Sequence, residues 1–168
     1  HWCVIDEKID WCDKRINAYI SDDVQAQSAK QLIGVGALTA SAAIATVVDF
    51  KQFKNGAQFG AWLGLTPKQS SSGGKTKLGK ITKRGDTYLR TLLIQGAKAA
   101  VMSAHMRHDP ISKWLFQLKE KSGWQKAAVA MANKNARILW AVMTKGVNFD
   151  PAYVSVKPGG SIGVAIAV

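Results

Sequence analysis

Apolar residues recur at spacings of three and four along most of the 168-residue chain, and this period is typical of amphipathic α-helices. Short segments rich in Gly, Pro, Asp and Ser separate these stretches, as expected of turns and helix ends. Helices are predicted over 4–20, on both sides of a turn at 32–36 within 24–48, and over 56–63, 86–104, 110–121 and 124–145. The pattern therefore predicts a mostly α fold, a bundle of about six helices.

Polar residues mark where several of these helices begin and end. Asn55 and Asp86 are good N-caps for the helices that follow them. Asp109-Pro110 combines a cap with a proline in the first turn, and Gly123 ends the same helix.

The helical period also assigns an inner and an outer side to each helix. Phe59 and Trp62 are expected in the core, together with the stripe that contains Leu89. Arg90 and Lys134 fall on the opposite sides of their helices, so we expect both to be exposed.

Composition divides the chain into three parts. Residues 1–23 are interpreted as the end of a linker or coiled-coil helix, 24–146 as a helical domain, and 147–168 as an extended tail rich in Pro and Gly. The chain opens within a helical pattern and without Met, so we expect it to be the back part of a longer protein.

The turn at 32–36 contains Gly34-Val35-Gly36. Two glycines around one aliphatic residue permit positive φ and leave N–H groups exposed at a helix N-terminus, where a phosphate can bind. This resembles a helix-hairpin-helix motif with Ala40 as a close-packing residue. A plain turn whose glycines serve only close packing fits the sequence too, and both interpretations stay open.

The most unusual stretch is residues 64–90, GLTPKQSSSGGKTKLGKITKRGDTYLR. It contains seven Lys and Arg residues against one acid, Asp86, and three serines followed by two glycines. Unpaired charges are too costly to bury, so this stretch must lie on the surface. We expect a long basic Ser/Gly loop that is mobile without a partner, in the kind of segment where function concentrates.

Net charge narrows the choice of partner. A formal charge of +12 suits a polyanion, most often nucleic acid, although a solvated basic surface is the alternative. A membrane-surface role is disfavoured because no basic amphipathic helix with a broad aromatic face is present. Cys3 and Cys12 match neither a zinc site nor a redox motif, which favours a reducing cytoplasm.

Two enzyme classes are disfavoured by the motifs that they require. The string Gly73-Gly74-Lys75-Thr76 resembles the end of a phosphate loop, but that pattern needs a glycine at the position of Gln69 and a buried strand before it. A serine hydrolase needs a base beside its serine and a Gly-x-Ser-x-Gly elbow. The sequence lacks this elbow, and its only histidines are His1, His105 and His108.

A serine within a cationic segment fits a different reaction, attack on a phosphodiester. Lys and Arg side chains neutralise the phosphate oxygens, and backbone N–H groups of neighbouring glycines can orient the reacting groups. A covalent phosphoserine conserves bond energy, so a strand could be cut and rejoined without a nucleotide cofactor. Ser-Gly runs are also common in plain flexible loops, so composition leaves this chemistry open.

Four pieces of the chain resemble, in order and spacing, the C-terminal domain of bridge-RNA-guided bacterial insertion-sequence transposases, the IS one-ten family. The pieces are LIGVGALTA (32–40), FKNGAQFGAWLGLTP (53–67), SSSGGKTKLGKITKRGD (70–86) and YLRTLLIQGAKAA (88–100). The resemblance implies that this domain supplies a serine nucleophile for DNA strand cleavage and exchange. The serine directly before the glycine corresponds to that nucleophile, which is Ser72 here, with Ser71 as its nearest competitor.

In that family an N-terminal RuvC-like domain carries the acidic ligands of a metal. The acids of this chain are scattered, so we expect no metal site or cofactor in it, Mg²⁺ in the domain that precedes it, and no recombination by this chain alone. The resemblance also implies partners: DNA, a structured guide RNA, the RuvC-like domain of the same protein, and further copies in a homo-oligomer. We expect a bacterial cytoplasmic protein associated with the nucleoid.

Phosphate contacts are expected from the glycine turn and the basic stretch. The candidates are Gly34, Gly36, Lys75, Lys77, Lys80, Lys83, Arg84 and Arg90. The alternative function is a non-catalytic, helix-hairpin-helix-type nucleic-acid-binding module in which the Ser-Gly segment is only a tether.

Overall fold

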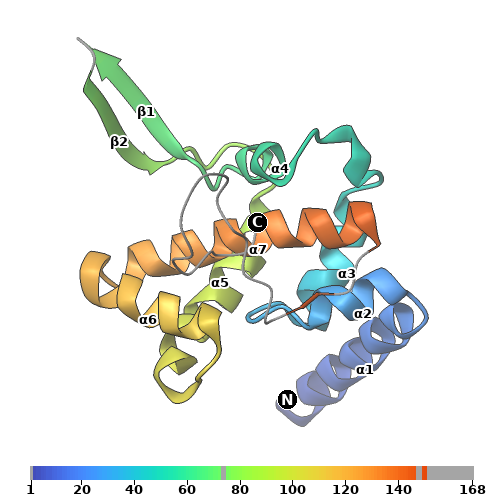
Figure 1. Cartoon of the computed structure of the whole chain (residues 1–168). Helices are drawn as coiled ribbons and strands as arrows, with labels where there is room; N and C mark the ends of the chain where they lie inside the picture. Colours follow the sequence, from blue (N-terminus) through green and yellow to red (C-terminus); the bar gives the residue numbers. More distant parts are fainter. Residues whose placement is uncertain (1, 73–74, 147–148, 151–168) are drawn as a thin grey trace.

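Helix α7 lies at the centre of the fold, and the other helices pack around it (Figure 1). This computed structural model describes residues 2–72, 75–146 and 149–150. Its elements are α1 (Trp2–Ser21), α2 (Val24–Lys30), α3 (Ala37–Thr46), η1 (Phe50–Gln52), α4 (Gly56–Trp62), β1 (Pro67–Ser72), β2 (Lys75–Ile81), α5 (Thr87–Ser103), η2 (Ala104–Met106), α6 (Pro110–Ser122) and α7 (Trp124–Lys145). Helix α7 contacts α2, α4, α5, α6 and the short 3₁₀ helix η1.

The mostly α prediction is confirmed, with α2–α7 as the bundle. Its helices begin where the sequence places their caps. Asn55 Oδ1 accepts a hydrogen bond from the Gln58 N–H at 2.9 Å, and Asp86 Oδ1 accepts one from the Leu89 N–H at 2.6 Å. Such caps satisfy N–H groups that the helix itself leaves unpaired. None of the helices in the described residues is long and apolar enough to cross a membrane.

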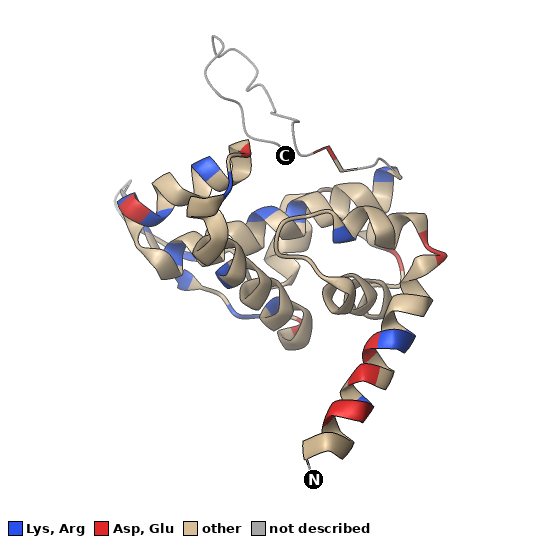
Figure 2. Cartoon of the chain, turned by 90° about the horizontal axis from the view of Figure 1, so that it is seen from below, with Lys and Arg blue, Asp and Glu red and all other residues tan. Residues whose placement is uncertain are grey.

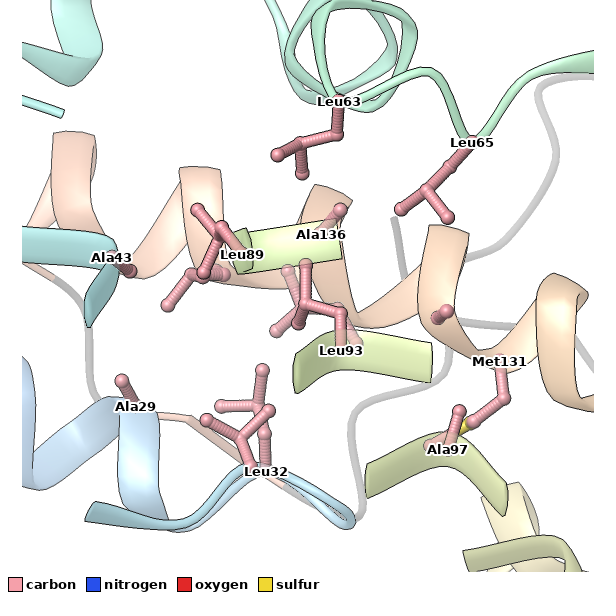
Figure 3. Packing of buried hydrophobic residues seen from close by; sticks show 14 of the residues in the cluster. Ala29, Leu32, Ala43, Leu63, Leu65, Leu89, Leu93, Ala97, Met131 and Ala136 are labelled. Atoms are coloured by element: carbon pink, nitrogen blue, oxygen red, sulfur yellow. The ribbon is translucent and has the colours of Figure 1, made fainter. Parts of the chain in front are cut away.

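The core is built from buried side chains of α2 to α7 and of the segments that connect them, and Figure 3 shows part of it. Leu63 and Leu65 enter from the end of α4, Leu89 and Leu93 from α5, and Leu32 from the α2–α3 turn. Each of these side chains is at most 2% exposed. Burying one such side chain contributes about 1.5–3 kcal/mol, so the segment after α4 is firmly tied to the bundle.

Helix α1 projects from the bundle and is mostly solvated (Figure 2). Of its residues only Ile20, in the last turn, is buried, where the helix meets α2 and α3. Six of the eleven acids of the chain lie within residues 6–23, along this helix and just after it. The bundle and the segments around it therefore carry a larger positive excess than the whole-chain charge suggests.

The turn between α2 and α3 is held by a close approach of two backbones. Gly34 has φ +84°, and a Cβ on it would lie 2.5 Å from the Gly96 carbonyl oxygen in α5. A Cβ on Gly96 would lie 1.7 Å from the Gly34 oxygen, and real Cβ atoms do not come so near another atom. The Asn135 side chain adds a hydrogen bond from its Nδ2 to the Ile33 carbonyl at 2.9 Å. Gly34 therefore serves close packing, which favours the plain-turn interpretation for this residue.

Three expectations about side chains and segments are wrong. Trp62 is 37% exposed, although it stacks on the fully buried Phe59, whose ring centroid lies 5.9 Å away. Lys134 is only 8% exposed. Its Nζ lies 5.3 Å from the centre of the Trp114 ring, and burial together with the Arg137 charge lowers its pKa to about 8.

The basic stretch is a β-hairpin rather than a loop, because its strands pair in register. The tail predicted over 147–168 lies outside the described residues except for Phe149 and Asp150.

Substitution of Gly34 and Gly36 should have opposite outcomes. Gly34→Ala adds a methyl group against the α5 backbone at positive φ, so we expect the free energy of unfolding to fall by about 2–4 kcal/mol. Gly36→Ala is the matched control, since Gly36 has no atom within 4 Å of a built Cβ and a φ of −96°. Urea denaturation of the purified chain measures both. Equal losses in the two variants would contradict the packing role of Gly34.

Candidate nucleic-acid interface

The basic stretch forms a two-stranded antiparallel hairpin that projects from the bundle beyond α4 (Figure 1). The backbone register pairs Gln69 with Leu78, Ser70 with Lys77, Ser71 with Thr76 and Ser72 with Lys75. An irregularity follows toward the bundle, where Pro67 pairs with Ile81. Such a bulge bends the ladder and increases its twist next to the attachment point.

Register assigns the serines to different faces of the hairpin. Paired residues of antiparallel strands share a face, and successive residues alternate between faces. Positions 70, 72, 75 and 77 therefore lie on one face and positions 69, 71, 76 and 78 on the other. The first face combines two serine positions with two lysine positions, whereas Ser71 shares its face with Thr76 and Leu78. The side chains at positions 71, 72, 75 and 76 lie outside the described part of the chain.

The hairpin is attached to the bundle through a tight crossing of backbone segments. Thr82 donates its N–H to the Thr66 carbonyl at 2.9 Å, and Lys83 donates its N–H to the Gly64 carbonyl at 3.1 Å. A Cβ on Gly64 would lie 2.2 Å from the Arg84 carbonyl oxygen, so a side chain here would separate the two segments. A two-stranded hairpin is marginally stable alone in water, so this attachment supplies the support that it needs.

Gly85 allows the second close contact of this crossing. It has φ +98°, and a Cβ on it would lie 1.7 Å from the Trp62 carbonyl oxygen at the end of α4. The next residue, Asp86, caps α5. The chain therefore passes from hairpin to helix directly beneath the end of α4, and only a glycine fits there.

Arg90 stabilises this crossing through hydrogen bonds of its buried side chain. It is 8% exposed, and its guanidinium donates to the Leu63 carbonyl oxygen at 3.1 Å and to the Thr87 hydroxyl at 3.2 Å. The expectation that Arg90 is exposed is therefore wrong, because the end of α4 leaves a carbonyl that this residue satisfies, and its burial disfavours the predicted phosphate contact. Arg90 thus positions the hairpin, and its charge is not exposed to solvent.

The other predicted cations lie where a polyanion could meet them. The side chains of Lys77, Lys80, Lys83 and Arg84 are exposed, and the side chain of Lys75 lies outside the described part. Among the described residues, none of these four cations forms an ion pair with an acid. A row of unneutralised cations on a projecting arm produces a strong local positive potential.

The structure does not bring the glycine turn to this interface. Gly34 packs on α5, and helices α5 and α7 lie between the α2–α3 turn and the base of the hairpin (Figures 1 and 3). Gly36 is exposed at the N-terminus of α3 on that distant side. The two groups of predicted phosphate contacts are thus separate.

Two features of the interface escaped the sequence reasoning. The strands have a signal in the printed sequence, since two glycines between polar runs are typical of a tight hairpin. The inward direction of Arg90 has no such signal, because its carbonyl partner lies 27 positions away in the sequence.

The described part of the chain contains no cluster of metal ligands. Among the described residues, no three His, Cys, Asp or Glu side chains gather closely enough to hold an ion.

Comparison with known proteins identifies the family. The model described as the transposase IS116/IS110/IS902 family matches residues 26–111, about half of the chain, including the glycine turn and the whole hairpin. The chain belongs to this transposase family. The match spans the turn, the hairpin and α5, which are the parts that carry the resemblance read from the sequence.

Individual relatives agree with the family. The chain is 44% identical over 147 residues to a probable family 20 transposase of Pseudomonas aeruginosa, covering 88% of this chain and 44% of that protein. It is 42% identical over 140 residues to the transposase for insertion sequence element IS1111A of Coxiella burnetii, covering 83% of this chain and 38% of the relative. The chain thus spans less than half the length of these relatives.

Removing the Arg90 guanidinium should loosen the base of the hairpin. We expect Arg90→Ala to lower the free energy of unfolding by about 2 kcal/mol, because the buried Leu63 carbonyl loses its charged donor. Arg84→Ala, which removes an exposed guanidinium from the same segment, should change it by less than about 0.5 kcal/mol. Urea denaturation compares the two, and an Arg84→Ala loss as large as that of Arg90→Ala would refute the positioning role.

Proposed function

We propose that this chain is the serine-bearing part of a DNA transposase and that Ser72 attacks the DNA backbone during strand cleavage and exchange. The observation that carries the proposal is the hairpin register, which places Ser72 opposite Lys75 and on the face of Ser70 and Lys77. Family membership supports it, since several relatives are named as transposases of insertion sequences.

The reaction at this face is a transesterification. The Ser72 oxygen attacks the phosphorus, its proton passes to solvent or a base, and the bond from phosphorus to one sugar oxygen breaks. The leaving sugar oxygen takes up a proton, and the phosphate stays as a serine ester. Attack by the hydroxyl end of another strand reverses these steps and releases the serine. Lysines on the same face would stabilise the charge that grows on the phosphate oxygens.

The hairpin register also supports Ser72 over Ser71 as the proposed nucleophile. Ser71 shares its face with Thr76 and Leu78, and the exposed Leu78 (61%) offers no charge to a phosphate. Ser72 has lysine positions directly opposite and two residues further along. Ser72 is therefore the nucleophile that we propose.

The remaining half of the site belongs to the rest of a longer transposase. By the family resemblance, a RuvC-like domain supplies acidic ligands and Mg²⁺, which polarises the phosphate when bound. We propose that this chain alone binds DNA but does not recombine it. We also propose that the protein binds a guide RNA, forms a homo-oligomer and associates with the bacterial nucleoid.

A non-catalytic helix-hairpin-helix-type module remains the competing function. The packing of Gly34 against Gly96 disfavours a phosphate contact at that glycine. The exposed Gly36 at the start of α3 leaves this competitor one candidate backbone contact.

Exchanging single serines in the complete transposase tests the nucleophile. Ser72→Ala should abolish the covalent protein–DNA adduct and recombination while DNA affinity stays within about twofold, because a single hydroxyl contributes little to binding. Ser71→Ala is the matched control and should keep the adduct. Denaturing gels with end-labelled DNA detect the adduct. A variant lacking Ser72 that still forms it would overturn the assignment, and so would its loss in Ser71→Ala alone.

Neutralising two hairpin lysines should change how DNA binding depends on salt. Each phosphate contact contributes about 0.9 to the slope of log K against log salt, so Lys77→Ala combined with Lys80→Ala should lower the slope by about two units. The matched control is Lys8→Ala combined with Lys14→Ala on the acidic helix α1, which should leave it unchanged. Fluorescence anisotropy with duplex DNA between low and moderate salt measures both slopes. An unchanged slope in the hairpin variant would refute these contacts.

A further inference from the structure

A hollow of about 250 Å³ opens between η2 and the first half of α6. Its lining residues are Ala104, His105, Arg107, Lys113, Phe116 and Gln117. Three of the six carry basic side chains and one is aromatic, a combination that the hairpin does not offer. The hollow is formed by different elements from the hairpin, and α6 and the hairpin leave the body of the molecule in different directions (Figure 1).

Phe116 is exposed and does not belong to the side of α6 that packs on the core. The apolar stripe of α6 consists of Ile111, Trp114, Leu115 and Leu118, which face the bundle. Phe116 lies off that stripe and is 42% exposed. Lys113 lies three positions before Phe116 and four before Gln117, spacings that place helical side chains next to one another, and all three line the hollow. An aromatic ring beside a lysine on the solvated side of a helix is a stacking surface rather than a core contact.

Polar groups around the ring are suited to a phosphate and to a base edge. Lys113 is exposed and offers an ammonium group. Nδ1 of His105 lies 2.9 Å from the Met102 carbonyl, so this nitrogen carries a hydrogen and Nε2 is left for a ligand. The Gln117 amide provides both a donor and an acceptor.

Asp109, which caps the start of α6 and pairs with the lining residue Arg107, is already engaged in hydrogen bonds. Asp109 Oδ1 accepts from the Ser112 N–H at 2.8 Å, and Oδ2 accepts from the Ser112 hydroxyl at 2.7 Å. Burial alone would raise the pKa of Asp109, but these hydrogen bonds and the Arg107 charge together lower it, so it stays ionised as a cap. Arg107 lies 3.4 Å from Oδ2 and is still about half exposed, with a side-chain exposure of 49%. The lining thus contains Arg107 and Lys113 and no acid, so the hollow has a positive excess.

We propose that this hollow binds one unpaired nucleotide of a single-stranded nucleic acid, with the base stacked on Phe116 and the phosphate held by Lys113 and Arg107. The volume is slightly below the roughly 300 Å³ at which pockets begin to enclose a whole drug-sized ligand, so it suits one flat base with its phosphate outside. A base inside a duplex is covered on both faces by its neighbours and cannot stack on a protein ring. The hollow therefore distinguishes single strands from duplexes. This site does not depend on the proposed cleavage at Ser72.

The test compares single-stranded and duplex probes of one sequence, bound to the purified 168-residue chain and followed by fluorescence anisotropy. Phe116→Ala should weaken single-strand binding about tenfold, the loss of one stacked base, while duplex affinity stays within about twofold. Phe116→Trp should retain single-strand affinity because its ring stacks as well. Tyr19→Ala is the matched control, since Tyr19 is an exposed aromatic (62%) on α1, away from the hollow. Phe116 is exposed, so each variant should fold, and circular dichroism melting checks this.

DNA and RNA versions of the single strand separate the two sources of such a nucleotide. A tenfold loss with either version supports the proposal and tells which nucleic acid enters the hollow. Equal losses for single strand and duplex would overturn it, because Phe116 would then act without regard to strandedness. Unchanged binding in Phe116→Ala would overturn it as well, and the exposed Met102, Met106 and Phe116 would then be a surface for a protein partner.

Discussion

The buried guanidinium of Arg90 and the backbone crossing that it stabilises determine how this domain presents its basic hairpin. Gly64 and Gly85 bring the chain under the end of α4, and Arg90 satisfies the carbonyl of Leu63 at the same place. Leu65, which follows at once, is buried in the core. A hairpin with polar residues on both faces has no core of its own, so its direction depends on this rigid base.

The charge distribution leaves few acids to compete with a polyanion for the hairpin cations. Acids are concentrated in and just after α1, and the exposed hairpin cations have no acid within ion-pairing distance in the described residues (Figure 2). The cations that the fold does use internally, Arg90 and Lys134, are buried against a carbonyl and against an aromatic ring. These two buried cations are thus separate from the exposed hairpin cations that are available to a polyanion.

Much of the fold could be read from local patterns. Asn55, Asp86 and Asp109 cap helices where expected, because capping depends on residues three positions apart. The family could be recognised for a similar reason, since its motifs are contiguous. The faces of Arg90 and Lys134 could not be read in this way. Helical period favours solvent for a cation, and only partners distant in sequence, Leu63 and Trp114, reverse that preference.

The sequence alone determined the helices, their caps, the positive excess and the serine-rich stretch, because these depend on neighbouring residues and on composition. Only the tertiary structure decided which glycines pack and which serine shares a face with lysines. Gly34 meets Gly96 from another helix, and the face of Ser72 follows from its pairing with Lys75 across the hairpin. Contacts between segments fix these choices, and a register shift of one residue would exchange Ser72 for Ser71.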